Sequence, residues 1–155
     1  MAVAGISTLG ITFGYGTEAT LNTKPTAFTK LTRINSIGEL SLEPEQIDAS
    51  ALEDEISRFI AGRSQVSSSI PVGVNLTDAT ETEWETLISA YEALTGGKRM
   101  WFEVIVPGLT KAFFFVAQPP TKLPMPEQGQ NSLMVMTVNL VTEEYIGLDT
   151  KVAFT

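Results

Sequence analysis

The sequence predicts a mainly β fold, a β-sandwich or open barrel with one α-helix packed at its flank. Three observations favour this fold class. In most stretches of the chain that are rich in apolar residues, these residues recur at every second position or form short continuous runs, as in strands. Only one stretch carries them at helical spacing. Gly and Pro separate the stretches, and 155 residues suffice for one domain with its own core.

The chain is expected to consist of an N-terminal arm, residues 1–27, and a β domain, residues 28–155. The arm is rich in Gly and Thr with scattered apolar residues, too apolar for a solvated linker and too interrupted by glycine for a regular strand. We interpret it as a segment that docks on another surface, with a frayed terminus as the alternative. Residues 28–37 predict a strand with an irregularity, because their apolar residues recur at every third position.

A long loop is predicted for residues 39–63. It mixes acidic residues with apolar anchors, shows no clean period and is interrupted by Pro44. Loops of this length are uncommon in compact domains and are usually functional or disordered, and the regular anchors argue against disorder. Residues 66–76 then alternate as a half-buried strand, in which Pro71 indicates an edge position or a bulge.

One amphipathic helix is predicted over about residues 80–95. Asp78 and Thr80 are both possible N-caps, each followed three residues later by Glu, and Gly96-Gly97 supplies the C-cap. Five apolar side chains at intervals of three or four residues are expected to form the stripe that packs in the core. They are Trp84, Leu87, Ile88, Tyr91 and Leu94.

The remaining residues predict three strands. Residues 99–106 and 111–117 form a hairpin turned by Pro107-Gly108, and the second strand is apolar on both faces, which indicates a central position or a subunit contact. A Pro-rich linker follows over residues 119–126. Residues 132–142 predict a long strand, and residues 143–155 a C-terminal tail.

Composition excludes several kinds of chemistry. The chain has no Cys and no His, which removes thiolate nucleophiles, thiolate metal sites and Ser-His-Asp arrangements. Its net charge of −8 does not favour binding to phosphates. No apolar run approaches the ~18 residues of a membrane-spanning helix, and the first residues lack the pattern of a signal peptide. We therefore expect a protein kept in a cytosol or in a particle assembled there.

The remaining signals for small-molecule chemistry are weak. Glu53-Asp54-Glu55 could act as hydrolytic carboxylates or as a calcium cluster, but such runs are usually a solvated face. The glycines at 10–16 lack a phosphate-binding spacing. Trp84 or Trp101 could stack a sugar, although both lie in apolar stripes that favour a core role. The sequence thus predicts no enzyme, no cofactor and no metal. A carbohydrate- or surface-binding β-sandwich is the alternative from a different functional class.

Several runs of residues resemble one known family. They are residues 28–38 (FTKLTRINSIG), 45–54 (EQIDASALED) and 59–62 (FIAG). The alternating strand to Asn75, the helix with Trp84 and Tyr91, and the hairpin turned by Pro107-Gly108 follow in order. Residues 28–142 thereby resemble the major tail tube proteins of long-tailed, siphovirus-type bacteriophages.

The resemblance implies a β-sandwich of two crossed sheets with a flanking helix, the tube-forming fold shared with type VI secretion tubes. It implies a structural virion protein whose hexameric rings stack into the hollow tail tube, the conduit for DNA delivery, assembled in the host cytoplasm. The implied partners are further copies, with tape measure, tail terminator and distal tail proteins, and DNA is only non-specific cargo. A tube subunit of a phage-derived particle or of a secretion apparatus is the alternative within this structural class.

By position, the resemblance also assigns the N-terminal arm and residues 40–62 to contacts between rings. The candidate contact residues in this segment are Leu40, Leu42, Ile47, Leu52, Ile56 and Phe59. The acidic composition is compatible with a DNA conduit, because an acidic wall repels phosphate. The same charge could equally lie outside and serve solubility.

Overall fold

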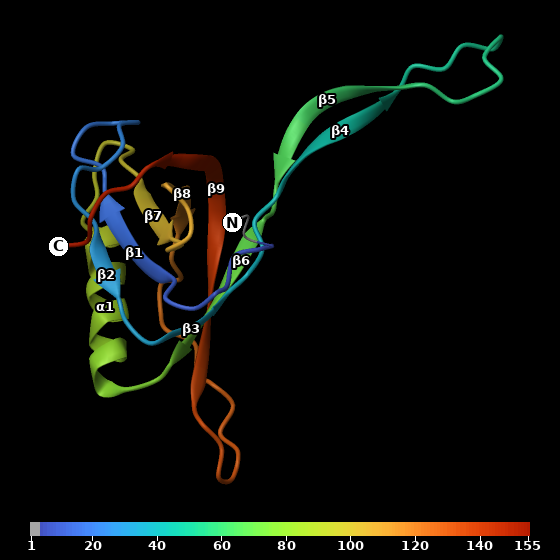
Figure 1. Cartoon of the computed structure of the whole chain (residues 1–155). Helices are drawn as coiled ribbons and strands as arrows, with labels where there is room; N and C mark the ends of the chain where they lie inside the picture. The colour runs from blue at the N-terminus through green and yellow to red at the C-terminus, as the bar shows by residue number, and fades with distance from the viewer. Residues whose placement is uncertain (1–3) are drawn as a thin grey trace.

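The computed structural model describes residues 4–155, which form nine strands and one helix. The strands are β1 Thr12–Thr17, β2 Thr29–Leu31, β3 Ile34–Ile37, β4 Leu42–Asp48, β5 Phe59–Val66, β6 Ser69–Asn75, β7 Met100–Ile105, β8 Lys111–Gln118 and β9 Val135–Thr150, and the helix is α1 Asp78–Glu92. Seven strands pair in the order β2-β1-β7-β8-β9-β6-β3, and β4 and β5 form a separate two-stranded ribbon (Figure 1). The mainly β fold class with one flanking helix is confirmed.

The long strand β9 divides the seven strands into two halves. Its residues 135–141 pair with β6, and its residues 141–150 pair with β8. We call β2-β1-β7-β8-β9 the five-strand half and β9-β6-β3 the three-strand half. The two halves therefore share only β9. Register shifts within the β8–β9 pairing accompany the bend of β9 seen in Figure 1. A bent strand that passes from one sheet to the other joins the two layers of the sandwich.

The main core lies between the two halves and α1. Alternate strand residues point inward, and the stacked rings of Phe13, Phe102 and Phe115 form its aromatic centre, with 5.3 Å between the Phe102 and Phe115 centroids. From α1, Trp84, Leu87 and Ile88 are buried. Tyr91 and Leu94 are half-buried and pack against the same cluster. The helix therefore presents the stripe expected from its spacing to the core.

The helix begins and ends slightly earlier than residues 80–95. Thr77, not Asp78 or Thr80, is the N-cap: its hydroxyl accepts a hydrogen bond from the Thr80 backbone N at 3.2 Å. Thr80 completes the capping box, because its buried hydroxyl lies 2.8 Å from the Thr77 backbone N and accepts its proton. Ala93 is the C-cap, so Gly96-Gly97 lies beyond the helix end.

The prediction of an N-terminal arm over residues 1–27 is wrong for its central part. Residues 12–17 form β1, which pairs with both β2 and β7 and contributes Phe13 and Tyr15 to the core. Gly14 and Gly16 do not interrupt this strand, because close neighbours cover its outer face. A Cβ on Gly14 would lie 2.3 Å from the Phe154 ring and 2.5 Å from the Thr29 carbonyl oxygen. Residues 1–3 lie outside the described part.

The predicted strand over residues 28–37 is two strands, β2 and β3, on different halves of the sandwich. The chain crosses between them at Thr32-Arg33, and Arg33 adopts φ of 56°. This crossing is the irregularity that the three-residue period indicated. Pro71 lies on β6, which is one strand in from the edge strand β3. Its carbonyl oxygen accepts a hydrogen bond at 2.8 Å from the backbone N of Gly38, the residue after β3.

The predicted C-terminal tail over residues 143–155 is wrong for its first part, because β9 continues to Thr150. Only the last residues leave the sheet. They run back over the outer face of the five-strand half, where Thr155 N donates to the Phe28 carbonyl oxygen at 2.9 Å. Phe28, Trp101 and Phe114 form a second cluster there, against which Phe154 packs. The Pro-rich residues 119–126 lie outside any strand, as predicted.

The predicted loop over residues 39–63 is also corrected, because its residues 42–48 and 59–63 are strand residues of the β4–β5 ribbon. Leu42 pairs with Val66 and Asp48 with Phe59. The register shifts between Pro44 and Gln46, so the side chains change faces within the strand. This bulge accommodates the proline and explains why the sequence shows no clean two-residue period. No helix in residues 4–155 is long and apolar enough to cross a membrane.

Candidate self-assembly surface

The β4–β5 ribbon and its tip, residues 41–67, project away from the body as a thin extension, which we call the projecting hairpin (Figure 1). Every residue of β4 is exposed. At its base, the Ser67 backbone N donates to the Ser41 carbonyl oxygen at 3.2 Å. A two-stranded ribbon without a sheet or helix beneath it is only marginally stable in water. The projecting hairpin is therefore a surface suited to being covered.

The tip of the projecting hairpin, residues 49–58, is held by its own polar groups. The Asp54 carboxylate accepts from the Ala51 N at 2.7 Å and lies 3.2 Å from Arg58 Nε. The Ser50 hydroxyl accepts from the Arg58 N at 2.8 Å. Hydrogen bonds donated by the Ser50 backbone and hydroxyl lower the pKa of Asp48. This network orders the polar groups and leaves the apolar side chains of the tip in solvent.

Five of the six candidate contact residues are exposed on the projecting hairpin. Two belong to the tip, where Leu52 is fully exposed and Ile56 is 80% exposed. Three belong to the strands: Leu42, Ile47 and Phe59. Leu40 differs, because it is half-buried against the main core.

The six candidate contact residues leave out one further exposed apolar residue of this surface. Ile60 is 56% exposed and lies directly opposite Ile47 in the β4–β5 pairing. The two side chains therefore share one face of the ribbon. The signal that could have found it is the hairpin register, which the bulge at Pro44 hides in the sequence.

The projecting hairpin is also strongly acidic. Residues 41–67 contain six carboxylates and only Arg58 and Arg63 as cations, a net charge of −4. Among the described residues, the Asp54–Arg58 pair is the one ion pair within it. Its surface therefore combines exposed apolar side chains with exposed negative charge.

A groove of about 540 Å³ lies at the root of the projecting hairpin, where the two halves of the sandwich part. We call it the base groove. Its lining residues from the three-strand side include Ile34, Ile37 and Leu40, and those from the five-strand side include Phe113 and Tyr145. None of its lining residues is charged. The base groove is therefore an apolar depression beside the acidic extension.

A second groove, of about 550 Å³, lies between α1 and the Pro-rich linker. Glu81, Glu85 and Glu92 line it from the helix, and Lys122 lines it from the linker. No three carboxylates within residues 4–155 are close enough together to hold a metal ion.

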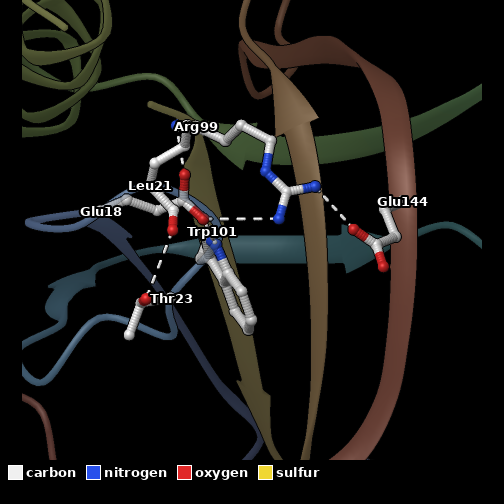
Figure 2. Close-up of polar contacts among 6 residues, drawn as sticks. All are labelled: Glu18, Leu21, Thr23, Arg99, Trp101 and Glu144. Atoms are coloured by element: carbon white, nitrogen blue, oxygen red, sulfur yellow. Dashed lines mark hydrogen bonds and ion pairs between the residues drawn. The ribbon is translucent and has the colours of Figure 1, made fainter. Parts of the chain in front are cut away.

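A polar network around the buried Glu18, the residue after β1, connects it to Arg99 and Trp101, and Arg99 in turn to Glu144 on β9 (Figure 2). Glu18 accepts hydrogen bonds from the Arg99 backbone N at 2.7 Å and from Trp101 Nε1 at 2.9 Å. Arg99 also pairs with Glu144 at 2.6 Å. Burial raises the pKa of Glu18, but these donors outweigh it and the net pKa is lowered. The network is structural, because its two carboxylates are held by the donors of Arg99 and Trp101; of its groups, Arg99 Nε alone is buried without a partner in residues 4–155.

The two tryptophans are part of the interior. Trp84 is 0% exposed in the main core, and Trp101 is 5% exposed with its indole nitrogen bound to Glu18. A sugar platform needs an exposed aromatic face. The carbohydrate-binding alternative therefore loses the residues on which it rested. In the Glu53-Asp54-Glu55 run, the Asp54 carboxylate already accepts a hydrogen bond from the Ala51 backbone N and forms an ion pair with Arg58.

Comparison with known proteins bears on the fold. No family model and no curated protein sequence matches the chain. Among solved structures, the chain is similar to one in the cryo-EM structure of the anti-feeding prophage (AFP) baseplate, six-fold symmetrised. The likeness covers 97% of this chain and 99% of that chain, with a TM-score of 0.54 and 12% identity. At this identity the likeness shows a shared fold across the whole chain.

Proposed function

We propose that this protein is a non-enzymatic structural subunit of a phage-type tail, and that it works by binding further copies of itself through the projecting hairpin. The observation that carries the proposal is the hairpin itself: an ordered ribbon with Leu42, Ile47, Leu52, Ile56 and Phe59 in solvent. Isolated apolar side chains on a surface are ordinary, but a set gathered on one thin extension marks an interaction site.

The fold likeness supports a tail-type particle as the setting. The similar chain belongs to a baseplate described as six-fold symmetrised, in a particle described as a prophage. The tail tube resemblance of residues 28–142 points to the same kind of assembly. We therefore propose hexameric rings that stack into a tube. Tape measure, terminator and distal tail proteins are the proposed partners, and DNA is the non-specific cargo.

The nature of the likeness favours a second form of the same proposal. The similar structure is a phage-derived particle and a baseplate, rather than the tail of a long-tailed phage. A tube or baseplate subunit of such a particle would use the same subunit contacts. The two forms differ in cargo: a DNA conduit needs a lumen that repels phosphate, whereas a particle without DNA does not.

The experiment is negative-stain electron microscopy of the purified chain over a concentration series. We expect six-fold rings or short tubes above a threshold concentration. The double variant Leu52→Ser/Ile56→Ser removes the apolar tip and should raise that threshold. Leu133→Ser is the matched control, because Leu133 is 67% exposed but lies outside the projecting hairpin. A chain that stays monomeric at millimolar concentration would refute the proposal.

A further inference from the structure

We propose that residues 151–155, which we call the C-terminal strap, form a pH-sensitive latch on the outer face of the five-strand half. The strap stays closed over that face while Glu103 beneath it is neutral, and it is released when Glu103 becomes charged. This latch does not depend on self-assembly and goes beyond the proposed function.

The C-terminal strap is attached to the body at few points. It leaves β9 and runs across the sheet towards β1 and β2 (Figure 1). Within residues 4–155, two of its residues donate hydrogen bonds to the body. Val152 N donates to Glu103 Oε2 at 2.9 Å, and Thr155 donates to the Phe28 carbonyl oxygen through its backbone N at 2.9 Å and its hydroxyl at 3.2 Å. A segment held so lightly can open while the rest of the sheet stays folded.

The face beneath the C-terminal strap is apolar. Phe28 and Phe114 are 0% exposed there, and Val152 and Phe154 of the strap pack against them. The Phe154 ring lies over Gly14, where a Cβ would come within 2.3 Å of it. The missing side chain on β1 therefore makes room for the strap. This apolar packing favours the closed state, and release exposes the face that the strap covers.

Glu103 is a carboxylate within this apolar face. It pairs with Gly14 on β1 and with Phe114 on β8, so neither neighbouring strand places a charge opposite it. Its side chain is 0% exposed, and among the described residues its Oε1 has no hydrogen-bond partner. A charged carboxylate costs free energy in such a place. Release of the strap frees Oε2 from Val152 N and lets water reach the carboxylate, so the charged form favours the open strap.

The other charges on this face oppose the effect without cancelling it. They are the cations Lys24, Lys30, Arg99 and Lys151 and the carboxylates Glu18, Glu144 and Asp149. Glu18 and Glu144 are paired with Arg99, and Asp149 is paired with Lys24. Burial raises the pKa of Glu103, and the Val152 N–H, Lys24 and Lys151 reduce that rise without abolishing it.

The raised pKa fixes the direction of the pH dependence. In the closed state the pKa of Glu103 lies above the ordinary carboxyl value, and in the open state it returns to that value. Opening therefore releases a proton at any pH between the two values. The open fraction is smallest at low pH and rises with pH until the raised pKa is passed. A transition that releases one proton shifts by at most about tenfold per pH unit.

Amide hydrogen exchange of the full chain, followed by NMR from pH 4 to 8, tests the latch. Each rate for Val152 N and Thr155 N is divided into the intrinsic rate at the same pH to give a protection factor. We expect both protection factors to fall as pH rises, by up to about tenfold per pH unit, and then to level off. They should also stay below those of the backbone amides in the middle of β8, because the strap opens before the body unfolds.

Two variants separate Glu103 from other carboxylates. Glu103→Gln keeps an acceptor for Val152 N and removes the charge, so the protection factors of the strap should no longer depend on pH. Glu18→Gln is the matched control, because Glu18 is also buried on this face but makes no hydrogen bond to the strap. It should leave the pH dependence in place. Thermal denaturation checks that each variant is folded.

Lys151→Gln is a third variant that leaves Glu103 itself intact. It removes one of the two cations that attract the charged carboxylate in the closed state. Protection of the strap should therefore be lower than in the parent at pH 8 and unchanged at pH 4, where Glu103 is neutral in the closed state. An equal change at both values would mean that Lys151 acts through packing, and would count against the latch.

The remaining outcomes are decisive. Protection that falls with pH in the parent and in Glu18→Gln, but not in Glu103→Gln, supports the latch. Protection that is independent of pH in the parent overturns it, as does an equal fall in Glu103→Gln. Strap amides that exchange only together with the amides of β8 would show that the strap does not open separately, and would also overturn it. Rings or tubes in electron microscopy bear on the proposed function alone.

Discussion

At the scale of single residues, the structure depends on a few side chains whose roles the sequence does not reveal. Glu103 is an example, because it is an acidic residue on the otherwise apolar strand β7 and its side chain is 0% exposed. One carboxylate oxygen accepts from the Val152 N at 2.9 Å, and the other has no partner. This carboxylate therefore fastens the C-terminal residues to the outer face of the sheet. Nothing in an alternating apolar pattern distinguishes such a residue from an exposed one.

Glu103 should make stability depend on pH. Burial raises its pKa, and Val152, Lys24 and Lys151 only partly oppose that rise. The folded state therefore binds the proton more tightly than the unfolded state, so stability is greatest below the ordinary pKa and falls as pH rises through the raised pKa. Glu103→Gln keeps an acceptor for Val152 and removes the titration. We expect urea unfolding to show that the free energy of unfolding of the variant rises relative to that of the parent as the pH is raised from 4 to 8.

A constant gap over that range would mean that Glu103 does not titrate differently in the two states. Glu18 provides an internal contrast, because its net pKa is lowered and its contribution should instead be lost as pH falls. Glu18→Gln should therefore cost more at neutral pH than at pH 4. The pH dependence of the stability change therefore has opposite signs in the two variants, although both carboxylates are buried.

Gly14 is a second residue whose role becomes clear only in the structure. A Cβ there would meet the Thr29 carbonyl oxygen at 2.5 Å as well as the Phe154 ring, and the backbone atom cannot move aside. We expect Gly14→Ala to lower the free energy of unfolding by about 1–3 kcal/mol, as overpacking does. Gly5→Ala is the matched control, because no atom lies within 4 Å of its Cβ position. Equal melting temperatures for the two variants would contradict the prediction.

At the scale of elements, the sequence was most informative where one period persisted. The α1 stripe, the turn at Pro107-Gly108 and the strand β6 were predicted because apolar spacing and turn residues agreed, whereas the caps of α1 are Thr77 and Ala93 rather than the residues predicted. The failures share a cause: tertiary contacts override local preference. β1 contains glycines that other segments cover, and β9 continues through the charged Glu143 and Glu144 and through Gly147 at φ of 89°.

The candidate surface was predictable in part for the same reason. Exposed apolar residues in an acidic segment marked residues 40–62 as unusual, and five of the six named side chains are on the projecting hairpin. The base groove was not predictable, because its walls come from strands far apart in the sequence and meet only through the bend of β9.

Trp84 gives the clearest test at the element scale. It is the largest fully buried side chain, on the core face of α1. Trp84→Ala should lower the free energy of unfolding by about 3–5 kcal/mol, because it leaves a cavity that the sheets cannot fill. Trp84→Phe should cost less, since it retains most of the volume and removes an indole nitrogen that has no hydrogen-bond partner. Chemical denaturation measures both, and a loss below about 1 kcal/mol for Trp84→Ala would contradict its placement in the core.

At the scale of the whole molecule, stability and assembly reside in separate parts. Neither apolar cluster of the body includes a residue of the projecting hairpin. The core of the body therefore forms without the projecting hairpin, whereas the ribbon leaves apolar side chains exposed to solvent. Such a division suits a subunit that must fold first as a monomer and then join other copies.

Truncation of the projecting hairpin tests this division directly. Replacement of residues 43–65 by a two-residue Asn-Gly turn joins Leu42 to Val66, which already pair across the base. We expect the free energy of unfolding to change by no more than about 0.5 kcal/mol, because no core contact is removed. The same protein should form no rings or tubes by electron microscopy at concentrations where the full chain does. A strongly destabilised variant would show that the hairpin supports the body, and a variant that still assembled would place the subunit contacts elsewhere on the sandwich.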